Sequence, residues 1–102
     1  MPTTMKSFQE FIRQTFGAKD AHRGIEGTFM WFIEEVGELS EALRAGRPTQ
    51  DVANEFADVL AWLATLANIA EIDLEEAIAA KYGHGCPACR SSPCHCGPDQ
   101  KP

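Results

Sequence analysis

Apolar residues recur at intervals of three and four along most of the chain, which is the spacing of one face of an α-helix. The pattern extends over two long stretches, residues 28–45 and 49–70, and over two shorter ones, residues 4–16 and 73–82. No part of the chain shows the alternation of apolar and polar residues that marks a half-buried β-strand. The pattern therefore predicts four α-helices and no strand.

Glycine and proline residues mark the expected connections between these helices. Gly17 is expected to end the first helix, and a polar loop over residues 18–27 is expected to follow it. Gly46 and Pro48 separate the two long helices, and Gly83 closes the last one. Four helices with short connections predict an all-α fold in the form of an antiparallel four-helix bundle.

The composition changes at Gly83, where the apolar periodicity stops. Residues 83–102 contain three Gly and four Pro, which disfavour regular structure. We therefore expect a helical domain over residues 1–82 and a separate tail over residues 83–102. The predicted helices hold only about 60 residues, which is a thin core for one bundle. A homo-oligomer is expected to complete that core.

The charge balance limits the partners that the chain can have. Asp and Glu number 15 against 9 Lys and Arg, which gives a formal net charge of −6. Nucleic-acid binding needs clustered positive charge, so this balance argues against it. No stretch reaches the roughly 18 apolar residues that span a membrane, and the polar start lacks the apolar core of a signal peptide. We expect a cytoplasmic protein with no membrane or nucleic-acid partner.

Part of the negative charge lies at helical spacing on the two long predicted helices. Glu35 and Glu38 are three residues apart on one helix. Glu55 and Asp58 are three residues apart on the next. Residues at this spacing are neighbours, and like charges there destabilise a helix. In antiparallel helices the two pairs could face each other, and a divalent cation would remove the repulsion. Oxygen ligands favour Mg²⁺ or Mn²⁺, which suits a polyphosphate substrate.

Two other interpretations of these acidic residues are open on the pattern alone. The carboxylates could form an ordinary solvated face of the helices. They could also belong to a di-iron carboxylate bundle, which needs Glu-x-x-His on two helices. The three histidines do not occur at such positions: His22, His84 and His95. The di-iron site is therefore disfavoured.

The same residues carry a resemblance to a known family. Residues 31–39 read Trp-Phe-Ile-Glu-Glu-Val-Gly-Glu-Leu, and residues 55–58 read Glu-Phe-Ala-Asp. They resemble the Glu-Glu-x-x-Glu and Glu-x-x-Asp motifs of the MazG-like nucleoside triphosphate pyrophosphohydrolases, over most of residues 8–82. The resemblance implies an all-α, Mg²⁺-dependent homodimer or homotetramer that cleaves nucleoside triphosphates to monophosphate and pyrophosphate.

By this resemblance the carboxylates would share the work of a metal-assisted hydrolysis. Four of them would bind Mg²⁺ or Mn²⁺: Glu35, Glu38, Glu55 and Asp58. Glu34 would lie outside the direct metal ligands or help to orient water, and Glu34 or Glu35 would act as the general base for the water that attacks phosphorus. All five are candidate catalytic residues. The enzyme would remove unwanted nucleotides from the nucleotide pool or control the level of a regulatory nucleotide.

Three further residues are candidates for substrate binding. Lys81 lies in the last turn of the final predicted helix, where the family often has a phosphate-contacting lysine, and is the first choice for this role; the alternative is that it only complements the helix dipole. Arg23, in the predicted loop, could fold over the phosphates. Trp62 lies one turn after Asp58 and could stack on the nucleobase, although large aromatic residues at helical spacing are more often part of a core.

All four cysteines of the chain lie within residues 86–96, in a C-x2-C pair followed by a C-x-C pair. Four thiolates suit a structural, tetrahedral Zn²⁺, which would fold a tail that cannot form a core by itself. A zinc-knuckle-like site is expected from all four: Cys86, Cys89, Cys94 and Cys96. A site with three cysteines and His84 or His95 is one alternative, and a redox-active or free-thiol tail is another.

The sequence thus predicts a nucleoside triphosphate pyrophosphohydrolase with a zinc-binding tail. The alternative is a non-catalytic nucleotide- or metal-binding oligomeric module whose tail binds a protein partner. A DNA-binding zinc protein is disfavoured, because Arg90 is the one basic residue between the first and last cysteines, with histidine counted as neutral.

Overall fold

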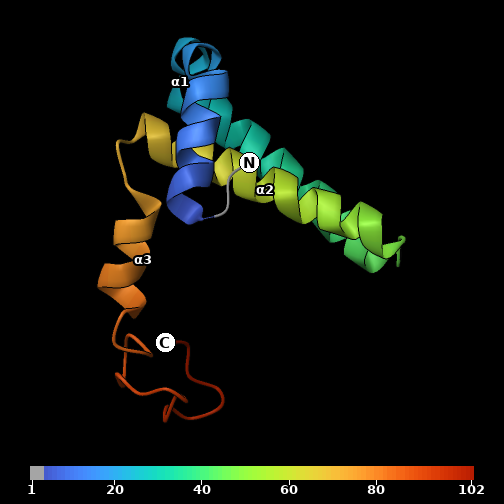
Figure 1. The fold of residues 1–102 in the computed structure, drawn as a ribbon. Helices are drawn as coiled ribbons and strands as arrows, with labels where there is room; N and C mark the ends of the chain where they lie inside the picture. Colours follow the sequence, from blue (N-terminus) through green and yellow to red (C-terminus); the bar gives the residue numbers. More distant parts are fainter. Residues whose placement is uncertain (1–3) are drawn as a thin grey trace.

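The computed structural model describes residues 4–102, so the first three residues of the predicted domain 1–82 lie outside the described part. It contains three α-helices, α1 (Met5–Arg44), α2 (Thr49–Ile69) and α3 (Leu74–Tyr82) (Figure 1). Residues 4–102 contain no β-strand, which confirms the prediction of an all-α fold. Among the described residues, no helix combines the length and the apolar character that crossing a membrane requires.

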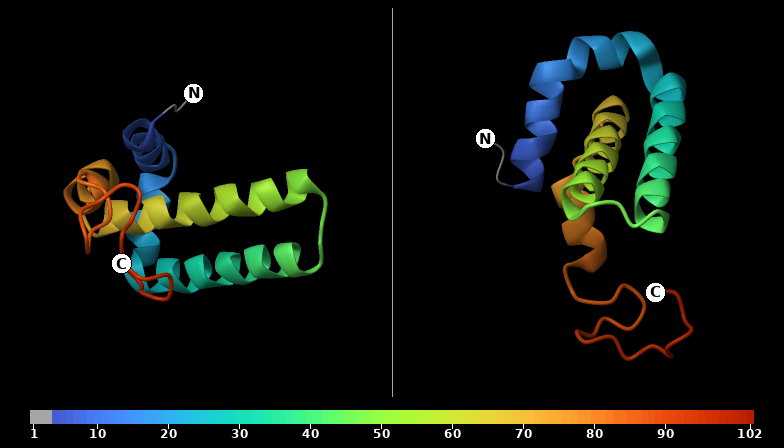
Figure 2. Two further views of the ribbon diagram at one scale, coloured as in Figure 1. Left: turned by 90° about the horizontal axis from the view of Figure 1, so that it is seen from below. Right: turned by 90° about the vertical axis from the view of Figure 1, so that its right-hand side faces the viewer.

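One bent helix, α1, replaces the first two predicted helices and the loop between them. Only Gly24 departs from helical geometry inside α1, with φ 82° and ψ 174°. The prediction of a polar loop over residues 18–27 is therefore wrong, and Gly17 does not end a helix. Alanine, lysine and arginine in this stretch favour a helix, whereas the positive φ of Gly24 is a conformation that residues with a side chain rarely adopt. Figure 2 shows the two halves of α1 meeting at this bend.

Side chains on both sides of Gly24 hold the bend in place. The Thr28 hydroxyl donates to the carbonyl oxygen of Gly24 at 2.7 Å. The Arg23 Nε donates to the Thr28 hydroxyl oxygen at 2.9 Å, and Arg23 also forms an ion pair with Asp20 one turn earlier. Thr28 is completely buried. The residues before the bend are thus fixed relative to the residues after it.

The second half of α1 runs antiparallel to α2, and the two helices lie side by side (Figure 2). The turn between them contains Gly46, with φ 62°, and a hydrogen bond from the Arg47 amide to the Ala42 carbonyl at 3.1 Å. The predicted short connection at Gly46 and Pro48 is confirmed. The N-terminal half of α1 crosses the other end of this pair, from which α3 extends away (Figure 1). The single chain does not by itself show a closed four-helix bundle.

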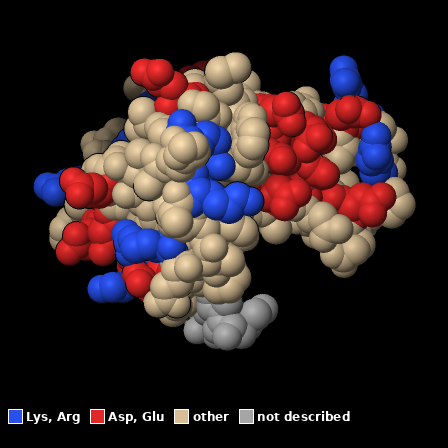
Figure 3. Space-filling view, turned by 90° about the horizontal axis from the view of Figure 1, so that it is seen from above, with Lys and Arg blue, Asp and Glu red and all other residues tan. Residues whose placement is uncertain are grey.

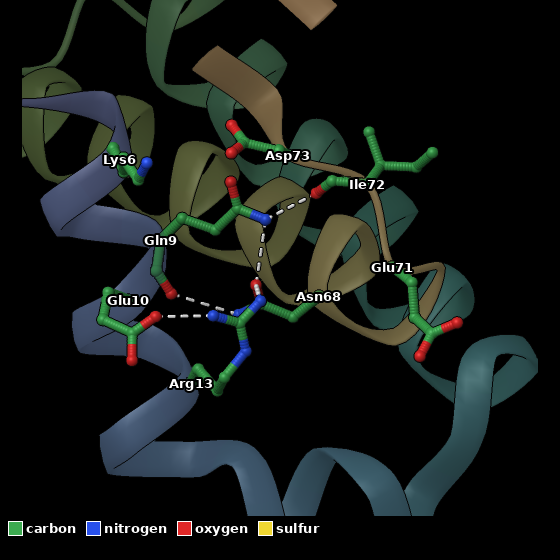
Figure 4. A pocket seen from close by; sticks show the side chains of 8 residues that line it. All are labelled: Lys6, Gln9, Glu10, Arg13, Asn68, Glu71, Ile72 and Asp73. Atoms are coloured by element: carbon green, nitrogen blue, oxygen red, sulfur yellow. Dashed lines mark hydrogen bonds and ion pairs between the residues drawn. The ribbon is translucent and has the colours of Figure 1, made fainter. Parts of the chain in front are cut away.

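A polar cluster ties the N-terminal half of α1 to the junction of α2 and α3 (Figure 4). Gln9 is buried, and its amide nitrogen donates to the Ile72 carbonyl at 2.7 Å and to the Asn68 side-chain oxygen at 2.9 Å. Its side-chain oxygen accepts from the Leu74 amide at 3.0 Å. Arg13 donates to the same Asn68 oxygen at 3.0 Å. Both amide hydrogens and the carbonyl oxygen of Gln9 are in use, so this cluster acts as a structural brace.

Gln9→Leu is expected to lower the free energy of unfolding by about 2 kcal/mol, because it leaves buried polar groups without partners. Urea unfolding followed by circular dichroism measures this change. Gln14→Leu is the matched control, since Gln14 is exposed and bonds to Glu10 on its own helix at 3.3 Å. Equal destabilisation by the two substitutions would contradict the bracing role of Gln9.

Much of the apolar surface of the described chain remains open. The buried apolar residues among those described are Ile12, Ala42, Ala64 and Ala67. Several large apolar residues on α1 and α2 are at least half exposed, including Phe29 at 51%, Met30 at 71% and Phe56 at 54%. Phe29, Met30 and Leu63 help to line an almost wholly apolar hollow of about 640 Å³. Monomeric proteins rarely leave a large apolar surface of this kind uncovered.

Candidate active site

The pairing of α1 with α2 brings acidic side chains from both helices together. One carboxylate oxygen from each of Glu35, Glu55 and Asp58 lies within 4.8 Å of the other two. Figure 3 shows a patch of acidic side chains with Lys and Arg side chains beside it. Oxygen ligands about 2.1 Å from Mg²⁺ are about 3 to 4 Å from one another. Small side-chain movements would therefore bring these three carboxylates around one ion.

Burial and mutual repulsion disfavour the charged form of these carboxylates. Burial, followed by the hydrogen bond and the charge of Glu38, raises the pKa of Glu35 from 4.5 to about 7. Burial, followed by the charges of Glu38 and Asp58, also raises the pKa of Glu55. One oxygen of Glu35 and one of Glu55 are buried without a hydrogen-bond partner. A hard divalent cation would supply the missing partner and offset the repulsion, so the ligand set fits such an ion.

The remaining acidic residues of the motif lie around this group. Glu38 is exposed and affects both Glu35 and Glu55 through its charge. With Glu55, Glu38 also lines a hollow of about 220 Å³, to which Arg47 and Asp51 belong. Glu34 is exposed and lies outside the group of close carboxylate oxygens. The structure thus brings together three of the four predicted ligands, with Glu38 next to them.

The metal-free chain is expected to lose stability as the pH rises from 4.5 to about 7. Glu35 in the unfolded chain releases its proton near its ordinary pKa of 4.5, whereas the folded chain keeps that proton until the pH reaches about 7. Unfolding between these values releases a proton, so the free energy of unfolding falls with rising pH. Urea unfolding in a chelator at several pH values measures the slope for wild type and for Glu35→Gln. The same slope in wild type and in Glu35→Gln would contradict Glu35 as the source of this pH dependence.

A cavity of about 360 Å³ opens directly beside the carboxylates, and Asp58 lines it. The wall includes Arg23 and Trp62, which are two of the three predicted substrate-binding residues. The Arg23 guanidinium lies 5.0 Å from the ring centroid of Trp31 and 4.8 Å from that of Trp62, so it makes cation–π contacts with both. The two indole rings meet edge to face at 5.3 Å. The cavity next to the acidic group therefore has aromatic and cationic side chains in its wall.

Lys81, the third predicted substrate-binding residue, is not brought to this cavity within the described chain. It lies in the last turn of α3, with its ammonium 5.7 Å from the ring centroid of Tyr82. Glu55 and Asp58 lie in the first half of α2, whereas α3 follows the C-terminal end of α2 and extends away from it (Figure 1).

Sequence reasoning missed the contact between Trp31 and Trp62 and the place of Asp20 in the cavity wall. Trp31 lies four residues before Glu35, and Trp62 lies four residues after Asp58. On antiparallel helices these opposite offsets bring both rings to one end of the carboxylate group, and this signal could have been used. Asp20 was hidden by the wrong assignment of its segment to a loop.

The four cysteines of the tail form a second candidate metal centre. Their sulfur atoms all lie within 4.8 Å of one another, with Cys86 and Cys96 at 3.8 Å and Cys89 and Cys94 at 3.9 Å. A disulfide would need a separation of about 2.05 Å. Sulfur ligands about 2.3 Å from a tetrahedral Zn²⁺ are about 3.8 Å apart, so the observed spacing fits four-thiolate zinc.

Backbone amides support the thiolate form of this cluster. The His95 amide donates to the Cys89 sulfur at 3.3 Å, and this bond is the main cause that lowers the pKa of Cys89 to about 6. The Cys96 amide donates to the Cys94 sulfur at 3.3 Å. Hydrogen bonds with the neighbouring thiols raise the pKa of Cys96 to about 12. The cluster therefore favours the thiolate at Cys89 and the neutral thiol at Cys96. A cation among the four sulfurs would stabilise the thiolate form of all of them, since zinc binds thiolates.

The chain has recognisable similarity to a known family. The family model described as the MazG nucleotide pyrophosphohydrolase domain matches residues 23–90, which are 68 of the 102 residues. The matched segment includes the carboxylates of α1 and α2 and the first two cysteines. A comparison with curated proteins gives no match.

Proposed function

The chain belongs to the family of the MazG nucleotide pyrophosphohydrolase domain, and on this basis we propose that it hydrolyses nucleoside triphosphates, ribo or deoxyribo, to monophosphate and pyrophosphate. The observation that carries this proposal is the approach of Glu35, Glu55 and Asp58 within 4.8 Å, with two buried carboxylate oxygens that have no partner. This group opens onto a cavity of about 360 Å³, which is large enough for a nucleoside. The enzyme would serve in cleaning or regulating the nucleotide pool.

The carboxylates would divide into ligands and a base. The proposed ligands of Mg²⁺ or Mn²⁺ are Glu35, Glu38, Glu55 and Asp58. When bound, the ion would neutralise phosphate charge and lower the pKa of a bound water. Glu34 or Glu35 would accept the proton of the water that attacks phosphorus. The water oxygen would bond to the α-phosphorus, the anhydride bond between the α- and β-phosphates would break, and the bridging oxygen would leave with the pyrophosphate, which balances the hydrolysis.

The cavity beside Asp58 would hold the nucleoside part of the substrate. Trp62 offers an indole face for base stacking, and Arg23 makes cation–π contacts with both that ring and Trp31. Because Arg23 is already bonded to Asp20 and Thr28, its guanidinium is fixed at the cavity wall. Nothing in the described chain supports the proposed phosphate contact of Lys81. The proposed helical catalytic unit spans residues 1–82, and the tail spans residues 83–102.

A panel of nucleoside triphosphates with Mg²⁺ tests the proposed activity. Pyrophosphate release is expected with at least one triphosphate, and a chelator is expected to stop it. A non-catalytic module would bind a nucleotide without releasing pyrophosphate, so the same panel distinguishes the two functions. Absence of hydrolysis from every triphosphate with both Mg²⁺ and Mn²⁺ would overturn the proposal.

We also propose that the exposed apolar faces of α1 and α2 join copies of the chain into a homodimer or homotetramer. Light scattering after size exclusion is expected to give a mass of two or four chains. Met30→Glu is expected to shift that mass toward one chain, because it puts a charge into the most exposed large apolar position of residues 4–102, at 71%. Glu75→Gln, on α3, is the control. A monomeric wild-type chain at micromolar concentration would contradict this assembly.

A further inference from the structure

Asp20 brings a buried carboxylate into the wall of the cavity that adjoins Asp58. Its side chain is 7% exposed. One carboxylate oxygen accepts from Arg23, and the other is buried without a hydrogen-bond partner. Buried polar atoms without partners are costly and uncommon, so each one calls for an explanation. A ligand that donates a hydrogen bond in this cavity would supply the missing partner.

The surroundings hold Asp20 in one position. Arg23 pairs with it, and the same guanidinium is fixed by the Thr28 hydroxyl and by the rings of Trp31 and Trp62. A carboxylate held in this way cannot readily turn to meet whatever ligand arrives. It therefore favours one pattern of ligand donors and disfavours a ligand acceptor in the same position.

We propose that Asp20 is a specificity-determining residue that reads the edge of the nucleobase, so that bases with an amino group are preferred over their oxo counterparts. This inference rests on the proposed triphosphate hydrolysis. Cytosine and adenine present an amino donor where uracil and hypoxanthine present an oxygen acceptor. The amino group would donate to the free oxygen of Asp20. An oxo group in that position would place its acceptor oxygen against the acceptor oxygen of Asp20. Both oxygens would then lack a hydrogen-bond donor.

The position of Asp20 relative to the carboxylate group agrees with this assignment. Asp20 on α1 lines the same cavity as Asp58 and Trp62 on α2. A nucleotide with its phosphates at Asp58 and its base against Trp62 would direct the base edge toward the remaining wall. Because this contact is remote from the reacting phosphorus, we expect it to act mainly on KM.

The experiment compares kcat/KM for dCTP with dUTP and for ATP with ITP. Wild type is expected to prefer the amino member of each pair by about 10- to 100-fold, the effect of one charge-assisted hydrogen bond. Asp20→Asn keeps an oxygen for Arg23 and puts an amide donor in place of the free acceptor. Its preference is expected to move toward dUTP and ITP. Asp99→Asn is the matched control, since Asp99 is exposed in the tail.

The outcomes separate this inference from the proposed function. Equal rates for both members of each pair in wild type would overturn it, as would an unchanged ratio in folded Asp20→Asn. If Asp20 had a purely structural role, Asp20→Asn would lower kcat/KM equally for both members of each pair, and their ratio would not change. If no triphosphate is hydrolysed, the proposed function fails, and calorimetric binding of dCMP against dUMP still decides whether the amino base is preferred.

Discussion

Replacing Asp58 by Asn is expected to reduce kcat/KM for triphosphate hydrolysis more than about 100-fold, because even residues that only support metal ligands cost 10- to 100-fold. Asp58 lies both in the group of close carboxylates and in the wall of the adjoining cavity. Glu38→Gln is expected to have an effect of the same order through the proposed metal site. Steady-state pyrophosphate release measures both losses, with Asp99→Asn and Glu75→Gln as controls.

The same Asp58 substitution is expected to raise the thermal stability of the metal-free chain. Asp58 contributes to the repulsion that raises the pKa of Glu35 and of Glu55, so its removal relieves a cost that the folded state carries. Activity and stability then change in opposite directions, which misfolding cannot produce. Thermal unfolding in a chelator gives the second measurement. Full activity in both Asp58→Asn and Glu38→Gln would refute the carboxylate mechanism.

Replacing Cys89 by Ser is expected to remove zinc from the purified protein, in which we expect about one zinc ion per chain. Cys89 has its pKa lowered to about 6, so it is the thiol best prepared to bind a metal at neutral pH. Metal content by mass spectrometry measures the loss. Ser92→Ala, in the same tail, is the control.

Loss of zinc should be confined to the tail. Residues 83–102 contain no helix in the described structure, so the helical signal in circular dichroism should change little, while limited proteolysis should cut the tail faster. Native protein that contains no zinc when it is purified without chelators would rule out the zinc assignment. A pair of disulfides in that protein would favour the redox interpretation instead.

The periodicity of apolar residues was sufficient to predict α2 and the second half of α1, and Gly46 with Pro48 was sufficient to predict the turn between them, because these features depend on local sequence. The bend at Gly24 was not predictable in the same way. Gly17, Gly24 and Gly27 occur close together with charged residues, and this composition is typical of a loop. The packing of Thr28 and Arg23 decides which glycine departs from the helix, and such contacts depend on tertiary structure.

The acidic residues of the candidate site were easier to predict than its cavity. The spacing of Glu35 and Glu38, and of the later pair, follows from helix geometry and from the short turn between the helices. Asp20 comes together with Trp31 and Trp62 only because α1 bends at Gly24. No local pattern reports such a bend, so the place of Asp20 in the cavity wall could be found only in three dimensions.

The bend at Gly24 also determines how this position should respond to substitution. A β-carbon added there would meet no atom within 4 Å, yet φ 82° excludes nearly all L-residues. Tolerance would therefore depend on handedness and not on size. The first methyl group, in L-alanine, should be as harmful as a large side chain, whereas D-alanine introduced by chemical synthesis should be accepted, since its mirror-image torsion preferences include this conformation.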